Sequence, residues 1–90
     1  MFKNLEELIK TIRERKNSSP ERSYTNKLLK DHNLSVSKVK EEMGELIEAV
    51  EENSNKIHEA TDVLYHLMVY LESSNIKIED VMEELKKRQK

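Results

Sequence analysis

The chain has no cysteine, one glycine and one proline among its 90 residues. The lack of cysteine excludes disulfides, zinc–thiolate sites and thiol nucleophiles. Turns between strands need more glycine and proline than this chain contains, so the composition favours a helical bundle with short loops over a sheet protein. No apolar run approaches the ~20 residues of a membrane span, and the start of the chain has no signal-peptide core. We therefore expect a cytoplasmic protein with no membrane partner.

Charge is nearly balanced, with 16 Lys and Arg against 18 Asp and Glu. A net charge of −2 gives no bulk attraction to nucleic acid. Hydrophobic residues make up 36% of the chain and recur periodically, so disorder is not expected. The length predicts a single domain, residues 1–90, which buries only about 60% of its unfolded surface and gains from oligomerising.

Apolar residues recur at helical spacing in successive segments, which predicts an all-α fold, a compact bundle of four to five helices. We expect helices over about 4–16, 23–31, 36–52, 55–74 and 78–88. Asn4 with Glu7 resembles a capping box at the start of the first helix, and Ser35 is expected to cap the third. Residues 17–20 should break the chain, and residues 53–55 should form a turn.

The segments 36–52 and 55–74 differ in their apolar surfaces. One arc of the first carries five apolar side chains: Val39, Met43, Leu46, Ile47 and Val50. The second is apolar around most of its circumference, apart from a stripe formed by Glu59, Asp62 and His66. A helix of that kind is buried on most sides. In so small a protein this predicts contact with a second subunit, and therefore a homodimer.

Two acidic pairs, Glu42-x-x-Glu45 and Glu59-x-x-Asp62, lie inside these two segments. Residues three apart share one face of a helix, so two neighbouring helices can direct four carboxylates at one point. Carboxylates so close repel each other unless a cation lies among them or some are protonated. Mg²⁺ takes oxygen ligands and keeps positions for water and phosphate, which predicts a metal site for phosphate chemistry. The main alternative is an internal ion pair with Lys38 or Arg22.

Other residues near these pairs carry weaker signals. Gly44 is the only glycine, and its place between Glu42 and Glu45 would permit close approach of a ligand or another helix, or reflect an outward position with no role. For His66 we expect a hydrogen-bonded interior position, with contact to metal or substrate as the alternative. His32 and His58 carry no signal beyond the surface.

The motifs resemble a known family. The stretches KVKEEMGELIEAV (residues 38–50) and EATDVLYHLMVYL (residues 59–71) are similar to the phosphoribosyl-ATP pyrophosphohydrolases of histidine biosynthesis, within the wider MazG-like nucleotide pyrophosphohydrolases. ERKNSSPERSYTNKLL (residues 14–29) and IEDVMEELKKR (residues 78–88) extend the resemblance over nearly the whole chain. Two departures are Lys40, where the family commonly has glycine, and the segment His32–Ser37, which lacks the family's Gly- and Lys-containing approach.

The resemblance implies a homodimeric enzyme that uses Mg²⁺ to hydrolyse phosphoribosyl-ATP to phosphoribosyl-AMP and pyrophosphate, the second step of histidine biosynthesis. It also implies functional coupling to the next enzyme of that pathway. Carried over residue by residue, it gives four metal ligands: Glu42, Glu45, Glu59 and Asp62. Glu41 would orient or deprotonate the attacking water, and Lys38 would contact phosphate. The candidates for holding substrate are Lys16, Ser23 and Tyr24.

Two other functions stay open at this stage. One is a MazG-like pyrophosphohydrolase acting on other nucleoside triphosphates. The other is a non-catalytic helical dimerisation module whose internal acids pair with Lys and Arg. A catalytic protein should gain thermal stability from Mg²⁺, whereas a structural module should not, because only a ligand of the folded state stabilises it.

Overall fold

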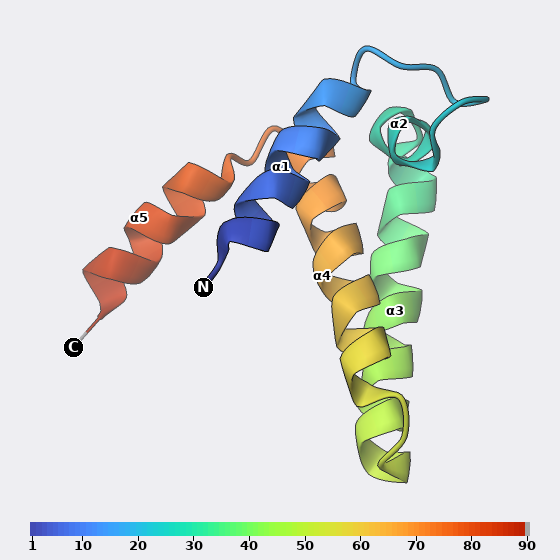
Figure 1. Cartoon of the computed structure of the whole chain (residues 1–90), viewed down its shortest axis with the longest axis vertical. Helices are drawn as coiled ribbons and strands as arrows, with labels where there is room; N and C mark the ends of the chain where they lie inside the picture. The colour runs from blue at the N-terminus through green and yellow to red at the C-terminus, as the bar shows by residue number, and fades with distance from the viewer. Residues whose placement is uncertain (90) are drawn as a thin grey trace.

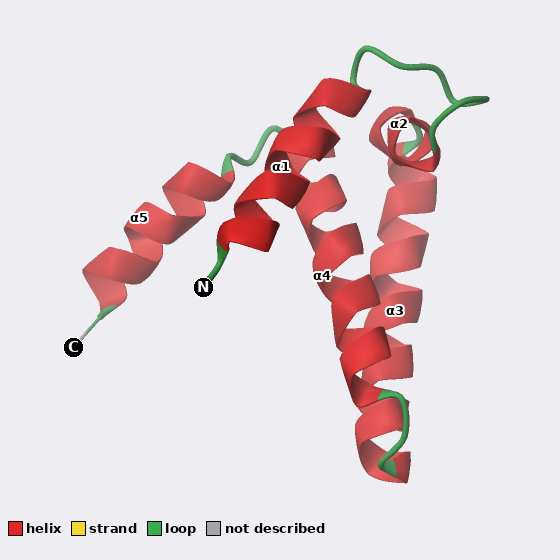
Figure 2. Ribbon diagram, viewed as in Figure 1, coloured by secondary structure: helices red, strands yellow, loops and turns green. Residues whose placement is uncertain are grey.

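The computed structural model describes residues 1–89, which form five α-helices and no strand within that range (Figures 1 and 2). The helices are α1 (Lys3–Arg15), α2 (Tyr24–Lys30), α3 (His32–Glu52), α4 (Lys56–Ser73) and α5 (Ile78–Arg88). The predicted all-α class is confirmed, and the boundaries expected from periodicity agree closely with those of α1, α2, α4 and α5. Within residues 1–89 no helix combines the length and the apolar character needed to cross a membrane.

Helices α3 and α4 form an antiparallel hairpin, which is the longest element of the fold (Figure 1). They are joined by the predicted turn at residues 53–55, where Asn53 and Asn55 adopt left-handed backbone angles with φ of 54° and 55°. Asparagine tolerates this conformation better than most residues do. The amide of Ser54 donates to the carbonyl of Ala49 at 3.0 Å, which satisfies a free carbonyl at the end of α3. The hairpin therefore places the two acidic pairs on adjacent helices.

The buried apolar core lies where α1 and α2 pack on the second half of α4. Its members are Ile12 of α1, Leu28 of α2, and Met68 and Val69 of α4. Leu28 and Val69 are 0% exposed, and partly buried leucines and isoleucines of α1 surround them. The core thus fixes α1 and α2 at one end of the hairpin and leaves its other end without cover from the rest of the chain (Figure 1).

The expected helix starts at Asn4 and Ser35 are wrong. Phe2 occupies the N-cap position of α1, and no side chain bonds to the free amides there. The third helix begins at His32, because the carboxylate of Asp31 accepts a hydrogen bond from the amide of Leu34 at 3.1 Å. Asp is as good a cap as Ser and comes earlier in the chain. Ser35 is instead 2% exposed inside α3.

The face that α3 buries is also not the apolar arc. Its buried residues are Ser35, Glu42 and Ala49. Their spacing of seven corresponds to about two helical turns, so a seam of small and polar side chains packs on α4. Three residues of the arc are exposed by 43–57%: Met43, Ile47 and Val50. Much of the apolar arc therefore faces outward in the single chain, and a carboxylate occupies the seam position.

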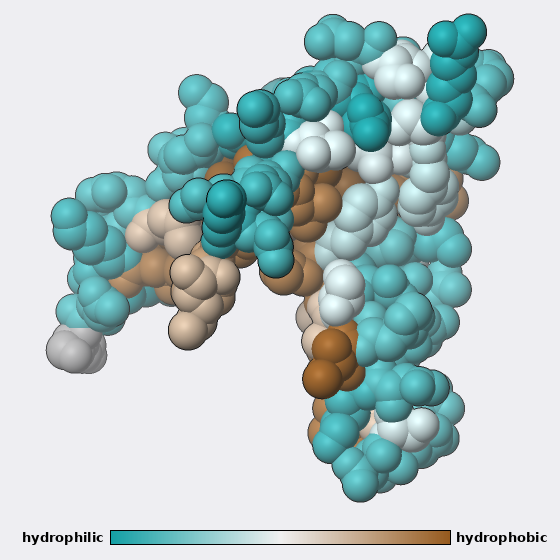
Figure 3. Space-filling model, viewed as in Figure 1, coloured by the Kyte–Doolittle hydropathy of each residue, from teal (hydrophilic) through white to brown (hydrophobic). Residues whose placement is uncertain are grey.

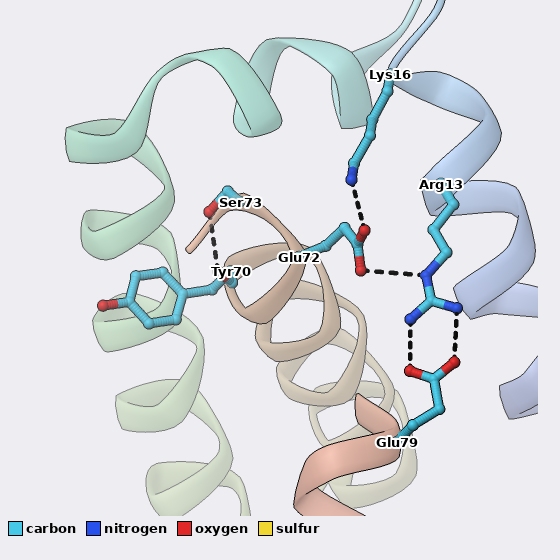
Figure 4. Close-up of polar contacts among 6 residues, drawn as sticks. All are labelled: Arg13, Lys16, Tyr70, Glu72, Ser73 and Glu79. Atoms are coloured by element: carbon cyan, nitrogen blue, oxygen red, sulfur yellow. Dashed lines mark hydrogen bonds and ion pairs between the residues drawn. The ribbon is translucent and has the colours of Figure 1, made fainter. Parts of the chain in front are cut away.

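An ionic network ties α5 to the rest of the fold (Figure 4). The guanidinium of Arg13 donates two hydrogen bonds to Glu79, at 2.9 and 2.7 Å, and a third to Glu72 at 3.3 Å. Lys16 donates to Glu72 at 2.6 Å. Arg13 lowers the pKa of Glu79 to about 2, chiefly through these hydrogen bonds. The network fixes the first turn of α5, while the remainder of that helix diverges from the hairpin (Figure 1).

Candidate metal and substrate site

Three of the four predicted metal ligands meet across the α3–α4 hairpin. Glu42 and Glu45 come from α3 and Glu59 from the first turn of α4, and one carboxylate oxygen of each lies within 4.8 Å of the others. Glu42 is only 9% exposed although its side chain is a carboxyl group. The hairpin turn thus brings Glu59 next to two acids that precede it in the sequence by 14 or more residues.

The fourth predicted ligand belongs to an adjacent group. Asp62 and Glu59 lie with His58, with one potential ligand atom of each within 4.8 Å of the others. His58 Nε2 is 3.4 Å from Asp62 Oδ2. The two groups share Glu59, so all four predicted carboxylates lie along one continuous site. His58 was missed by the sequence analysis, and its only signal there is its four-residue spacing from Asp62.

Two of the carboxylate oxygens have lone pairs without a hydrogen-bond partner, which suits a cation. Oε2 of Glu42 and Oε2 of Glu59 are both buried and have no hydrogen-bond partner among residues 1–89. A buried polar atom without a partner is costly, so such atoms call for a ligand or an ion. The donors that converge from α3 and α4 at Glu42, Glu45 and Glu59 are all oxygens, which Mg²⁺ and Ca²⁺ prefer. These residues therefore fit a hard divalent cation.

Electrostatics in the group point the same way. Burial raises the pKa of Glu42, and the negative charge of Glu45 raises it further. The pKa of Glu59 is also raised, first by desolvation and then by Glu45. Each raised pKa means that the folded protein disfavours the charged carboxylates in the absence of a cation. A bound divalent cation would remove that penalty.

Three further candidates lie beside the carboxylates. Lys38 of α3 donates to Glu41 at 3.3 Å, one turn further along the same face. The pKa of Tyr24 is raised overall, chiefly by partial burial. The ammonium of Lys38 lowers it, and the charges of Glu42 and Glu41 raise it. Tyr24 at the start of α2 is thus within electrostatic range of the α3 acids. Lys38 and Glu41 therefore form an ion pair beside Glu42 in the sequence of α3, and contact of Tyr24, Lys38 and Glu41 with substrate or water stays a prediction.

The other two substrate candidates have structural partners. The hydroxyl of Ser23 accepts from the amide of Asn26 at 3.1 Å and caps α2. Lys16 pairs with Glu72, which is ten residues beyond Asp62 on α4 and so about 15 Å along the helix axis. Lys16 thus lies with Glu72 (Figure 4), and the structure does not bring it to the four candidate metal ligands. Contact of Ser23 and Lys16 with substrate stays a prediction.

Asn26 is a buried residue that the sequence analysis missed. Its side-chain amide is 0% exposed and donates to the carbonyls of Arg15 at 2.7 Å and Ser18 at 3.0 Å. These bonds hold the end of α1 and the following loop against α2. Asn26 therefore fixes the segment that leads into Ser23 and Tyr24. Its sequence signal is weak, because a polar residue in a short amphipathic helix is ordinarily exposed.

Two aromatic residues of α4 bond to the start of α2. The hydroxyl of Tyr24 is 3.2 Å from Nε2 of His66, and Oγ1 of Thr25 bonds the hydroxyl of Tyr65. His66 is 8% exposed, and its Nδ1 is 2.8 Å from the backbone carbonyl of Asp62. The expected hydrogen-bonded interior position of His66 is confirmed.

Gly44 faces open space in the single chain. A Cβ atom built at this position would meet no atom within 4 Å among residues 1–89. The helix therefore gains nothing within the chain from the lack of a side chain here, which costs about 1 kcal/mol relative to alanine. Close approach of a ligand or a second subunit stays a prediction.

The fold and this site together define an all-α protein with a carboxylate-lined site on an antiparallel helix pair. The phosphoribosyl-ATP pyrophosphohydrolase family matches residues 5–89, and the chain belongs to that family. The resemblance inferred from the acidic motifs is thereby confirmed.

Individual relatives agree over most of their length. A protein of Methanococcoides burtonii named phosphoribosyl-ATP pyrophosphatase is 40% identical over 93% of this chain and 90% of its own. Proteins of the same name from Bacillus cereus and Dechloromonas aromatica are 43% and 39% identical, over 90% and 94% of this chain and 78% and 82% of their own. No solved structure matches the chain.

Proposed function

We propose that the protein hydrolyses phosphoribosyl-ATP to phosphoribosyl-AMP and pyrophosphate, with Mg²⁺ held by Glu42, Glu45, Glu59 and Asp62. The observation that carries the metal assignment is the convergence of α3 and α4 acids with two buried, unpartnered oxygens. The substrate assignment is supported by family membership and by the printed names of the relatives. Hydrolysis of a phosphoanhydride is the activity that these names describe.

The proposed roles of the chain's own groups are those that the family resemblance implies. Mg²⁺ held by Glu42, Glu45, Glu59 and Asp62 would neutralise charge at the phosphates and would make water a better nucleophile. Glu41 accepts a proton from the attacking water. The water oxygen forms a bond to the α phosphorus as the bond to the bridging oxygen breaks, and pyrophosphate leaves with that electron pair. The ammonium of Lys38, which is 3.3 Å from Glu41 in the free protein, would turn to the phosphates and offset the negative charge that accumulates there.

Pyrophosphate release with Mg²⁺ tests this proposal directly. We expect kcat/KM for phosphoribosyl-ATP to exceed that for ATP, GTP, CTP and UTP by at least about a hundredfold, since the binding energy of the extra phosphoribosyl group favours the cognate substrate. A preference for an ordinary nucleoside triphosphate would keep the site and reject the substrate. No release from any of them would favour a structural helical module.

A homodimer is the second part of the proposal. Besides the α3 arc, exposed apolar residues lie on α4 at Ile57 and Leu64 and on α5 at Met82 and Leu85. Figure 3 shows apolar surface over α1, α4 and α5 on the sides that face the gap between α5 and the α3–α4 hairpin. Exposed apolar surface of this extent marks an interaction site. A second copy would cover it and would supply core that a 90-residue chain cannot bury alone.

The dimer can be tested by charging the α3 arc. Ile47→Glu places a carboxylate on the exposed apolar arc, and we expect it to weaken dimerisation by at least about a hundredfold, because an unpaired charge in an apolar interface is strongly unfavourable. Sedimentation equilibrium measures the dissociation constant. Ser37→Glu introduces a carboxylate at an exposed position of the same helix that lies away from the arc, and it serves as the control. A monomeric native protein at micromolar concentration, or equal dimerisation of Ile47→Glu and native chains, would refute this interface.

A further inference from the structure

Two consecutive residues of α2 bond to two consecutive residues of α4. Tyr24 bonds to His66 at 3.2 Å, and Thr25 bonds to Tyr65. The Tyr24 ring meets the His66 ring edge-on, with centroids 6.0 Å apart and planes at 77°. Tyr24 is 47% exposed, whereas His66 is 8% exposed and lies behind it. A ligand in solvent can therefore reach Tyr24 but not His66.

The hydrogen bonds of His66 determine the direction of the bond to Tyr24. Nδ1 of His66 lies 2.8 Å from the carbonyl oxygen of Asp62, which only accepts, so Nδ1 carries the proton. In the neutral imidazole the other nitrogen then has a lone pair and accepts. The Tyr24 hydroxyl, whose pKa is raised by burial, keeps its proton and donates it to Nε2 of His66. Its oxygen is left with acceptor capacity alone.

We propose that His66 is a positioning residue that holds the Tyr24 oxygen as a hydrogen-bond acceptor for a donor group of the nucleotide, a ribose hydroxyl or the adenine amino group, and not as a donor to phosphate. Fully ionised phosphate oxygens only accept, so they gain nothing from an oxygen whose proton is already engaged. Lys38, which lies within electrostatic range of Tyr24, supplies the donor that phosphate needs. Because His66 also bonds the backbone of Asp62, the acceptor is fixed relative to the carboxylate site.

This inference rests on the proposed nucleotide hydrolysis, and a double-mutant cycle on that reaction tests it. Tyr24→Phe removes the hydroxyl, and His66→Asn retains a donor near the Nδ1 position but offers no acceptor near Nε2. We expect each to raise KM for phosphoribosyl-ATP about tenfold with kcat within about twofold, as expected for one lost hydrogen bond. The double variant should resemble the single ones, since both remove the same contact. Additive effects would overturn the proposal.

Two further variants separate positioning from helix docking. In His66→Gln the side-chain amide oxygen reaches the Nε2 position, so KM should return most of the way to the native value. Tyr65→Phe removes the neighbouring bond between the same two helices and should leave KM unchanged. A rise in KM for Tyr65→Phe as large as that for Tyr24→Phe would assign the effect to docking of α2 and reject a specific role for His66. If His66→Asn does not fold, the KM values of Tyr24→Phe and His66→Gln still test the proposal: the first should rise and the second should stay near the native value.

Inhibitors distinguish the kinds of group that Tyr24 contacts. Tripolyphosphate carries phosphates without hydroxyl or amino donors, and we expect its inhibition constant with Mg²⁺ to be the same for native protein and Tyr24→Phe. An equal weakening of tripolyphosphate and ATP would show contact with phosphate and overturn the proposal. Among nucleotides, a weakening seen with ATP but absent with 2′-deoxy-ATP identifies the hydroxyl as the donor. A weakening absent with inosine triphosphate identifies the amino group.

A spectroscopic readout is independent of turnover. Nitrogen chemical shifts of the His66 ring at pH 8 should report a proton on Nδ1 and none on Nε2. A proton on Nε2 would reverse the bond to Tyr24 and overturn the inference even in an active enzyme. Conversely, a native protein that fails to hydrolyse phosphoribosyl-ATP rejects the proposed substrate, while the ring shifts and ATP binding still test the role of His66.

Discussion

Replacing Glu59 with Gln is expected to lower pyrophosphate release from phosphoribosyl-ATP by about a thousandfold, because the two ligand groups share this carboxylate. An amide is a poor ligand for Mg²⁺ and brings no charge to the site. The same substitution should raise the melting temperature of the metal-free protein. Burial and Glu45 disfavour the charged form of Glu59, as its raised pKa shows, and a neutral side chain removes that repulsion. Loss of activity with gain of metal-free stability is a combination that simple unfolding cannot produce.

Glu51→Gln is a matched control for this experiment. Glu51 is an exposed residue near the end of α3, and the same change of charge there should alter neither turnover nor metal-free stability appreciably. Glu59→Gln with more than about a tenth of native activity would remove Glu59 from the metal site. A lower melting temperature for metal-free Glu59→Gln would contradict the electrostatic account of the cluster.

Local sequence patterns predicted those parts of the fold that are set by local chemistry. The bounds of α5, Ile78–Arg88, follow from its apolar period, and the turn at residues 53–55 follows from three small polar residues. The start of α3 was missed because Asp31 and Ser35 suit an N-cap equally well, and nothing local selects between them. Ser35 is taken up by the seam against α4, which is a tertiary contact.

The orientation of α3 shows a deeper limit of periodicity. The pattern marks Met43, Ile47 and Val50 as one apolar face, and that face exists. Periodicity cannot say what covers a face, and in the single chain this one is exposed while Glu42 lies in the seam. A buried carboxylate is the kind of departure from local consistency that occurs at functional sites.

For the site itself, spacing predicted which acids share a helix face, but contacts between helices had to come from the structure. Glu42, Glu45 and Glu59 meet as the two acidic motifs suggested. The hydrogen bonds from α2 to Tyr65 and His66 join residues that are 40 and 42 positions apart in the sequence. Nothing in the sequence around Tyr65 or His66 indicates which residue of α2 it contacts. Lys16 pairs instead with Glu72, a partner that sequence spacing does not indicate.

Competition between Mg²⁺ and protons is expected to give the largest change in stability. At pH 8, Mg²⁺ at about one hundred times its dissociation constant should raise the melting temperature by roughly 10 °C or more, since binding to the folded state alone contributes about 2.7 kcal/mol. The increment should shrink steadily as the pH falls toward 5. Glu42 and Glu59 bind protons with raised pKa values, and a protonated carboxylate is lost as a ligand.

Without metal the pH dependence should have the opposite sign. A raised folded-state pKa contributes stability that is fully present below the ordinary glutamate value of 4.5 and is lost as the pH rises through the folded value. The pKa of Glu79 is lowered to about 2, so its contribution is present above 4.5 and is lost only at lower pH. Above pH 4.5 the carboxylate cluster therefore dominates over Glu79, and metal-free protein should melt at a lower temperature as the pH rises through the raised pKa values of Glu42 and Glu59.

Calorimetric scans at fixed protein concentration and matched ionic strength, with NaCl replacing MgCl₂ in the controls, separate binding from charge screening. Glu42→Gln should abolish the Mg²⁺ increment, because it removes a ligand. It should reduce the metal-free pH dependence without abolishing it, because Glu59 keeps its own raised pKa through desolvation and Glu45. A Mg²⁺ increment that is equal at pH 5 and pH 8 would place the cation on groups other than these carboxylates. A metal-free melting temperature that rises over the same interval would show that the acids of α3 and α4 do not repel one another in the folded chain.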